Sequence, residues 1–160
     1  MEKLKKEIQE VVNLFRSGKV LKAEQLSKKL ILKNPKIPFL YNLLGLILVE
    51  LKKIDEALKY YEDGIKIDPN YPQIYNNIGI LFFNYKYSGN TNKIENFYKK
   101  SISLNNKLPE VHNNLGSFYE SIDKVQEASD CFKKAISLDP KFFYAYHNLG
   151  NICVSMGNFK

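Results

Sequence analysis

The sequence contains few of the residues from which reactive or metal-binding sites are built: two cysteines and two histidines in 160 residues. Cys131 and Cys153 form no CxxC pair, so we expect inert, buried thiols. His112 and His147 lie too far apart to share one helix as metal ligands, and we expect His112 to pack in the core. There is also no glycine-rich loop that could cradle a phosphate. The sequence therefore predicts no catalytic residues, no metal and no other cofactor.

Long apolar runs, linkers and a leader segment are also missing. The longest apolar run, residues 39–51, is interrupted by Asn42 and Glu50 and is too short to span a bilayer. Residues 1–7 are highly charged and lack the apolar core of a signal peptide. No stretch rich in Gly, Ser or Pro separates two domains. These absences predict a cytoplasmic protein without membrane insertion.

The formal net charge of +7 is concentrated at one end. Residues 1–37 hold ten basic and four acidic side chains, so they account for nearly the whole excess. Most of these lysines fall on the side of a helix that we expect to face solvent, where they favour solubility. Arginines interleaved with aromatic residues, as used on single-stranded nucleic acids, are absent. We expect no nucleic-acid partner.

Four glycines recur in nearly the same setting. Gly45, Gly79, Gly116 and Gly150 each follow a Leu or Ile, and the last three follow an Asn two residues earlier. They are 34, 37 and 34 residues apart. A period of this length indicates one supersecondary unit stacked on itself, and the apolar spacing within each unit is helical. Series of alanines and prolines keep the same period and agree on three extra residues in the third unit, within residues 84–91.

These residues resemble the tetratricopeptide repeat, in which two helices pack through small side chains. The fourth unit fits the family pattern best, with Leu115, Gly116, Tyr119, Ala128 and Pro140 among its matching positions. The resemblance implies an all-α, right-handed superhelical solenoid of helix-turn-helix repeats over the whole chain. We predict a single array, 1–160, with repeats at 4–37, 38–71, 72–108 (carrying the insertion), 109–142 and a truncated 143–160.

The resemblance also implies a function: the first helices of such repeats line a concave groove that binds a protein or an extended peptide. By periodicity the groove residues are Phe39, Asn42, Leu46, Val49, Asn76, Asn77, Ile80, Phe83, Asn113, Asn114, Ser117, Tyr144, His147, Asn148 and Asn151. The helix over 39–49 is apolar nearly all round. Leu46, Val49 and Ile80 are therefore either an apolar binding patch or are covered by the N-terminal helix. A co-chaperone-type carboxylate clamp is not expected, because Ile8 and Val12 occupy the positions that need Lys and Asn.

The recurrent asparagines suggest a sharper hypothesis. Asn77, Asn114 and Asn148 could form a ladder of amides that hydrogen-bonds a peptide backbone, or they could only help to pack the helices. Such a ladder resembles the asparagine-lined repeat region of the O-linked N-acetylglucosamine transferase. The main alternative is thus the substrate-recruiting arm of a larger enzyme, such as a glycosyltransferase, with its catalytic domain beyond Lys160. A third alternative is self-association through an uncapped last helix, which would leave Leu149, Ile152 and Cys153 exposed.

Overall fold

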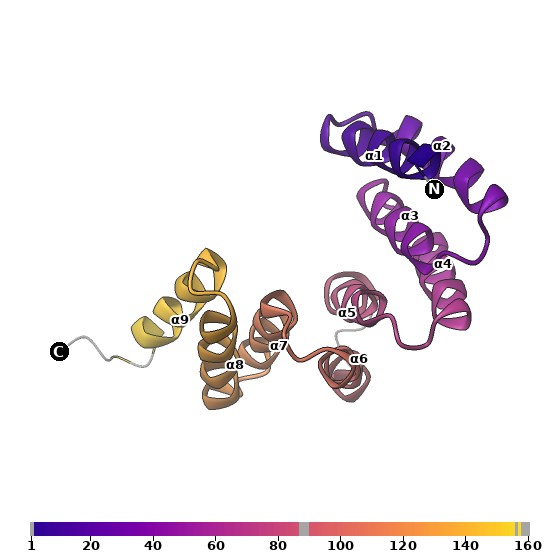
Figure 1. Ribbon diagram of the computed structural model, residues 1–160. Helices are drawn as coiled ribbons and strands as arrows, with labels where there is room; N and C mark the ends of the chain where they lie inside the picture. The colour runs from indigo at the N-terminus through magenta and orange to yellow at the C-terminus, as the bar shows by residue number, and fades with distance from the viewer. Residues whose placement is uncertain (1, 87–89, 156, 158–160) are drawn as a thin grey trace. The chain divides into compact units, whose positions relative to one another are not determined.

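The computed structural model describes residues 2–86, 90–155 and 157, and every regular element within them is a helix (Figure 1). The chain divides into two compact units, unit 1 over residues 1–81 and unit 2 over residues 82–160. No strand occurs in these described ranges, so the all-α class predicted from the periodicity is confirmed.

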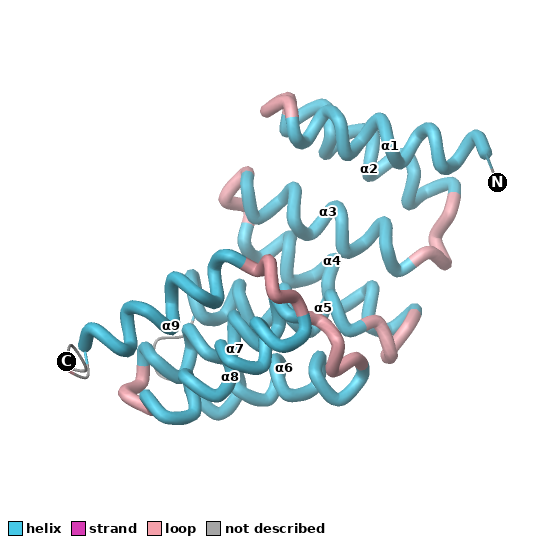
Figure 2. Tube along the Cα trace, turned by 60° about the vertical axis from the view of Figure 1, so that its left-hand side comes forward, coloured by secondary structure: helices cyan, strands magenta, loops and turns pink. Residues whose placement is uncertain are grey.

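Within each unit, helices that follow one another in the chain pack side by side (Figures 1 and 2). Unit 1 contains α1 (Glu2–Arg16), α2 (Val20–Lys33), α3 (Pro38–Glu50), α4 (Ile54–Ile67) and α5 (Pro72–Leu81). Unit 2 contains the π-helix η1 (Phe82–Lys86), α6 (Thr91–Leu104), α7 (Pro109–Ser121), α8 (Val125–Leu138) and α9 (Phe143–Ser155). Proline is the first residue of α3, α5 and α7, where its missing N–H costs no helical hydrogen bond.

The turns inside three helix pairs, α1 with α2, α3 with α4 and α7 with α8, share one geometry. Lys52 and Asp123 both adopt a φ of 60°, and Gly18 adopts 74° in the corresponding turn of the first pair. The next residue donates its backbone N–H to a carbonyl five residues earlier, as from Lys53 to Leu48 at 2.9 Å and from Lys124 to Tyr119 at 3.0 Å. This is the left-handed helix ending of the Schellman motif. It reverses the chain within three residues and brings the second helix back along the first.

Two of the recurrent glycines, Gly45 and Gly116, lie where the two helices of a pair meet. A Cβ atom on Gly45 would overlap the buried ring of Tyr61, and one on Gly116 would lie 2.6 Å from Cε1 of Phe132. Both contacts are far inside van der Waals distance, so each glycine makes room for an aromatic ring of the second helix. Gly150 holds the same position on α9 and has nothing within 4 Å among the described residues.

The loops between pairs also repeat their chemistry. The side-chain oxygens of Asp68, Asn105 and Asp139 accept the backbone N–H two residues later, at 2.9–3.0 Å. Tyr41 and Tyr75 donate their hydroxyls to the carbonyl six residues earlier, and His112 Nε2 donates to the corresponding carbonyl of Asn106 at 3.1 Å. Burial lowers the pKa of His112, whose ring is 8% exposed. His112 thus lies in the core, as predicted, and replaces a tyrosine.

Some local expectations need correction. Cys131 is half-buried, and burial raises the pKa of its thiol to about 11, but Cys153 is exposed rather than buried. Ile152, expected to be exposed on the last helix, is only 2% exposed because α9 packs on α8. The predicted insertion begins in η1, whose last residue is Lys86, while residues 87–89 lie outside the described part of the chain.

Candidate functional site

The predicted groove residues lie on the first helices of the repeats and on η1. In unit 1, α3 carries Phe39, Asn42, Leu46 and Val49, and α5 carries Asn76, Asn77 and Ile80. In unit 2, η1 carries Phe83, α7 carries Asn113, Asn114 and Ser117, and α9 carries Tyr144, His147, Asn148 and Asn151. We call these two sets the inner face of unit 1 and the inner face of unit 2.

The inner face of unit 1 is largely apolar. Phe39 and Leu46 are 36% and 37% exposed, and Val49 and Ile80 are half-buried. Four other large apolar side chains of α3 are completely buried: Leu40, Leu44, Ile47 and Leu48. The N-terminal helix α1 does not bury Leu46. Of the two alternatives for this strip, its exposure favours an apolar binding patch over a covered one.

The asparagines of unit 1 form a bonded pair across two repeats. Asn77 Nδ2 on α5 donates to Asn42 Oδ1 on α3 at 2.8 Å, and Asn76 Nδ2 lies 3.4 Å from Asn77 Oδ1. Asn42 and Asn76 are each 7% exposed, whereas Asn77 is half-buried. Asn42 therefore forms the floor of the inner face, and Asn77 is the amide that remains accessible.

Unit 2 repeats this pair with the same separation of 35 residues. Asn148 Nδ2 on α9 donates to Asn113 Oδ1 on α7 at 3.0 Å and lies 3.4 Å from Ser117 Oγ. Asn113 is 9% exposed. The amide recurrence noted in the sequence thus includes a structural role, because each bond joins the first helices of consecutive repeats. The second hydrogen of Asn148 Nδ2 is directed to Ser117, whereas the second hydrogen of Asn77 Nδ2 could serve a ligand.

The remainder of the unit 2 inner face is polar with an aromatic end. Tyr144 is 66% exposed, and the His147 ring stacks on Phe143 at 6.2 Å between centroids while Asn151 Nδ2 lies 3.3 Å from His147 Nε2. Phe143, 70% exposed, extends the site beyond the residues chosen from periodicity. Phe83, by contrast, meets Phe118 edge-on at 5.9 Å and is half-buried, so it contributes partly to the core.

Two carboxylates, the buried Glu24 and the half-buried Glu95, link second helices to the following repeat, and sequence reasoning missed both. Glu24 on α2 accepts hydrogen bonds from Lys28 at 2.7 Å and from Lys53, at the start of α4, at 2.8 Å. Burial alone would raise the pKa of Glu24, but the two lysines outweigh it and the pKa lies below its usual value. One sequence signal could have indicated this contact. Glu24 lies 29 positions before Lys53, and Lys53 immediately precedes the second helix of the next repeat.

Glu95 on α6 occupies the equivalent place in unit 2. It bonds Lys99 at 2.6 Å, accepts the Tyr119 hydroxyl at 2.9 Å and lies 4.0 Å from Lys124, 29 positions later. The hydrogen bond from Lys99 lowers the pKa of Glu95, with a further contribution from Tyr119. Both clusters are structural links between repeats, because each carboxylate is already satisfied by its own chain.

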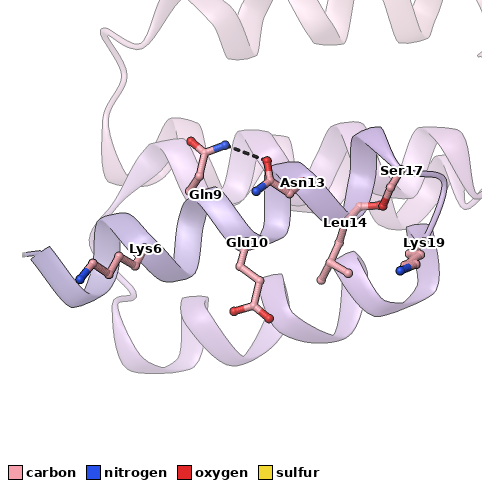
Figure 3. Close-up of a pocket in the computed structure, with 7 residues that line it drawn as sticks. All are labelled: Lys6, Gln9, Glu10, Asn13, Leu14, Ser17 and Lys19. Atoms are coloured by element: carbon pink, nitrogen blue, oxygen red, sulfur yellow. Dashed lines mark hydrogen bonds between the residues drawn. The ribbon is translucent and has the colours of Figure 1, made fainter.

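A hollow of about 490 Å³ lies along α1 and the turn after it, and Leu14 is the one apolar residue among those that line it (Figure 3). Its lining includes Lys6, Gln9 and Asn13, with the Gln9 amide donating to Asn13 Oδ1 at 2.9 Å. Thirty-four residues later the same positions are apolar and buried on α3: Leu40, Leu43 and Ile47. The hollow is therefore the hydrated counterpart of a helix-packing face.

Chemistry beyond binding finds no support in the described residues. No group of three or more His, Cys, Asp or Glu side chains in that part of the chain could hold a metal ion. Over the same residues, no helix combines the length and the apolar character needed to cross a bilayer. The inner faces carry apolar, amide and aromatic side chains together with the Ser117 hydroxyl and the His147 imidazole.

Paired antiparallel helices, joined by left-handed turns and packed through glycine against an aromatic ring, define a helical-repeat protein. Comparison with known families specifies it. Residues 34–84 match the TPR repeat, and residues 109–142 and 131–160 match two descriptions of the tetratricopeptide repeat. The matched segments together take in more than half of the chain, which belongs to the tetratricopeptide-repeat family.

Solved structures show the same fold at low sequence identity. The chain is 21% identical to TTC0263, a thermophilic TPR protein of Thermus thermophilus, with a TM-score of 0.80 over 90% of this chain and 78% of the other. It is 21% identical to the first TPR of Spaghetti (RPAP3), bound to the HSP90 peptide SRMEEVD, with a TM-score of 0.67 over 75% and 93%. YrrB, described as a TPR protein with an unusual peptide-binding site, is 19% identical with a TM-score of 0.67 over 84% and 68%. No curated protein matches the chain.

Proposed function

We propose that this protein is a peptide-binding scaffold and that the inner face of unit 1 is its principal binding surface. The observation that carries the proposal is the pair of exposed apolar side chains, Phe39 and Leu46, on a helix whose five other leucine and isoleucine residues are buried. About a third of each residue is exposed, so burying the remainder under a ligand contributes about 0.5–1 kcal/mol for each of the two. The fold is shared with proteins described with a bound peptide or a peptide-binding site.

The neighbouring amide gives the same surface a polar contact. Asn77 is half-buried beside this strip, and only one of its two amide hydrogens is used by Asn42. An amide that both donates and accepts can bond a peptide backbone whatever its side chains are. We infer a ligand with apolar side chains toward Phe39 and Leu46 and with backbone toward Asn77. An acidic C-terminal peptide held by a carboxylate clamp is not expected, since Ile8 and Val12 on α1 cannot pair with a carboxylate.

The test is selection of peptides from a random library with the intact chain, followed by affinity measurements on the winners. Leu46→Glu is expected to weaken binding by about tenfold or more, since a charge would have to be buried under the ligand. Tyr146→Glu is the matched control, because Tyr146 on α9 is an exposed large hydrophobic residue, 49% accessible, that does not belong to the inner face. Equal affinity of Leu46→Glu and the wild-type chain for every selected peptide would refute the proposal.

A further inference from the structure

The side of α2 that faces solvent combines exposed leucines with lysines. Leu21 and Leu32 are 63% and 83% exposed, the latter being the most exposed of the large apolar residues described. Eleven residues are about three helical turns, so the two leucines lie on one side of α2, about 16 Å apart. Lys22, Lys29 and Lys33 run beside them, one to four residues away from a leucine. We call these five residues the outer face of α2.

The charge of this face is not compensated by its own helix. Glu24 is the one carboxylate in α2, and it is buried between Lys28 and Lys53. Lys33 has Glu7 at 3.8 Å, but Lys22 and Lys29 have no carboxylate within 4.0 Å among the described residues. Unlike α4 and α8, α2 has no acidic residue in its first turn. The outer face is therefore cationic along its whole length.

One end of the face opens into a cavity of about 420 Å³. It is lined by Gly18, Lys19, Val20, Leu21 and Lys22 and, from the turn after α3, by Leu51. Three leucine and valine side chains form its apolar wall, and two lysines form a cationic rim. A cavity of this size and composition can receive one large apolar side chain whose neighbours carry negative charge.

We propose that the outer face of α2 docks an acidic amphipathic helix of a partner protein, with one of its apolar side chains in the cavity beside Leu51. Charge complementarity selects an acidic occupant, since Lys19, Lys22 and Lys29 have no partners of their own within the described part of the chain. The spacing of the two leucines matches apolar residues three turns apart on a partner helix. This surface is separate from the inner face, so the inference goes beyond the proposed function.

An anionic membrane is the other acidic apolar surface that could be considered, and the geometry disfavours it. Helices that lie in a bilayer interface present a broad apolar face. The apolar face of α2, with Ala23, Leu30 and Ile31, is buried against the rest of unit 1. Only two leucines remain outside, and the cavity is concave, which suits an inserted side chain rather than a lipid surface.

The experiment uses the full chain and a displayed library of helical peptides in which leucines are fixed at helical spacing and all other positions are random. We expect enrichment of peptides rich in Asp and Glu. Their affinity should fall by about tenfold or more between about 50 and about 300 mM salt. It should fall by a similar factor in the double variant Leu21→Ser, Leu32→Ser, whose substituted residues are exposed and leave the core unchanged. Leu46→Ser, on the inner face, should bind these peptides as the wild-type chain does.

The proposal is overturned if no acidic peptide is enriched, or if the double variant retains the selected peptides. It is also overturned if vesicles containing about 30% phosphatidylserine bind the chain through Leu21 and Leu32 while the peptides do not. Leu46→Glu tests the inner face and the double variant tests α2. If one of the two proposals fails, the result for the other can therefore still be interpreted.

Discussion

The inner faces of units 1 and 2 occupy corresponding positions of the repeat but differ in chemistry. Leu46 and Val49 on α3 correspond to Ser117 and Glu120 on α7, 71 residues later in both cases. The asparagine pairs beneath them are nevertheless alike, Asn42 with Asn77 and Asn113 with Asn148. The fold therefore fixes the floor of each face and leaves its accessible positions open to variation, which is where specificity for a ligand can be encoded.

Packing positions vary only when their partner compensates. The first repeat has Val11 where later repeats have glycine and Ser27 where they have Tyr61 and Phe132, and both Val11 and Ser27 are completely buried. The bulk at this contact has moved from the second helix to the first. Total volume is conserved across the pair, as expected for a close-packed interior.

The largest effect is expected from adding one carbon at equivalent glycines. Gly45→Ala should destabilise the protein by about 2–3 kcal/mol, because Tyr61 is buried and cannot move aside. Gly150→Ala should stabilise it by up to about 1 kcal/mol, since Gly150 faces open space and alanine favours the helix. Urea unfolding of both variants measures the difference. Equal effects would contradict the packing role assigned to the recurrent glycines.

The asparagine pairs should come next. Asn77→Ala leaves the buried Asn42 carbonyl without its donor and should cost about 1–3 kcal/mol. Asn148→Ala should cost less, because Asn148 is surrounded on α9 by exposed residues, Tyr144, His147 and Asn151. Chemical denaturation of the single variants checks the order, and peptide binding by Asn77→Ala, measured on folded protein, separates packing from recognition. Unchanged stability with lost binding would make Asn77 purely a ligand contact.

The two carboxylate clusters predict how stability depends on pH. The pKa values of Glu24 and Glu95 are lowered in the fold, so each group stabilises the protein above its unfolded value and loses that contribution as pH falls through the folded value. Glu24→Gln should lower stability by about 1–2 kcal/mol near neutral pH and by much less near pH 3. Glu95→Gln should show the same convergence with smaller amplitude, because its side chain is 16% exposed against 7% for Glu24. Melting temperatures across that pH range that stay parallel to the wild-type curve would argue against these links.

The smallest effect is expected in the turns. Lys52 adopts a left-handed φ of 60° that glycine adopts without strain, so Lys52→Gly should raise stability by about 1 kcal/mol at most. Asp123→Gly should gain less, because aspartate tolerates this conformation better than lysine. Thermal unfolding of the two variants tests the ranking. If either glycine destabilises the protein, the contacts of the original side chain stabilise the fold by more than its left-handed backbone conformation costs.

The sequence predicts the helices well because small residues recur where helices pack closely and prolines recur where helices end. Gly45 and Gly116 lie where the period required, and Asp68 and Asp139 end second helices before proline, as expected. The site is predicted less completely. Periodicity identifies positions on a helix face, but it gives neither burial nor partners, so Asn42 and Asn113 turned out to be floor residues.

Contacts between repeats escaped sequence reasoning for a related reason. The bond from Lys53 to Glu24 joins residues 29 positions apart whose meeting depends on how two helix pairs stack. The outer face of α2 escaped because its lysines alone suggest a solubilising surface, whereas the exposure of Leu21 and Leu32 becomes known only once α2 is packed. Ile152 is the opposite case: the sequence suggested that it is exposed, but it is buried because α9 packs on α8.

The asparagine pairs have a mechanical consequence. In unit 1 the amide accessible to a ligand, Asn77, is also the one that ties α5 to α3. A peptide that bonds Asn77 and contacts Leu46 touches both sides of that tie at once, so it resists any force that would pull the two helices apart. A peptide that withdraws the Asn77 hydrogen from Asn42 would release it. If a peptide binds here as proposed, its effect on the contact between α3 and α5 depends in part on whether the bond from Asn77 to Asn42 is kept.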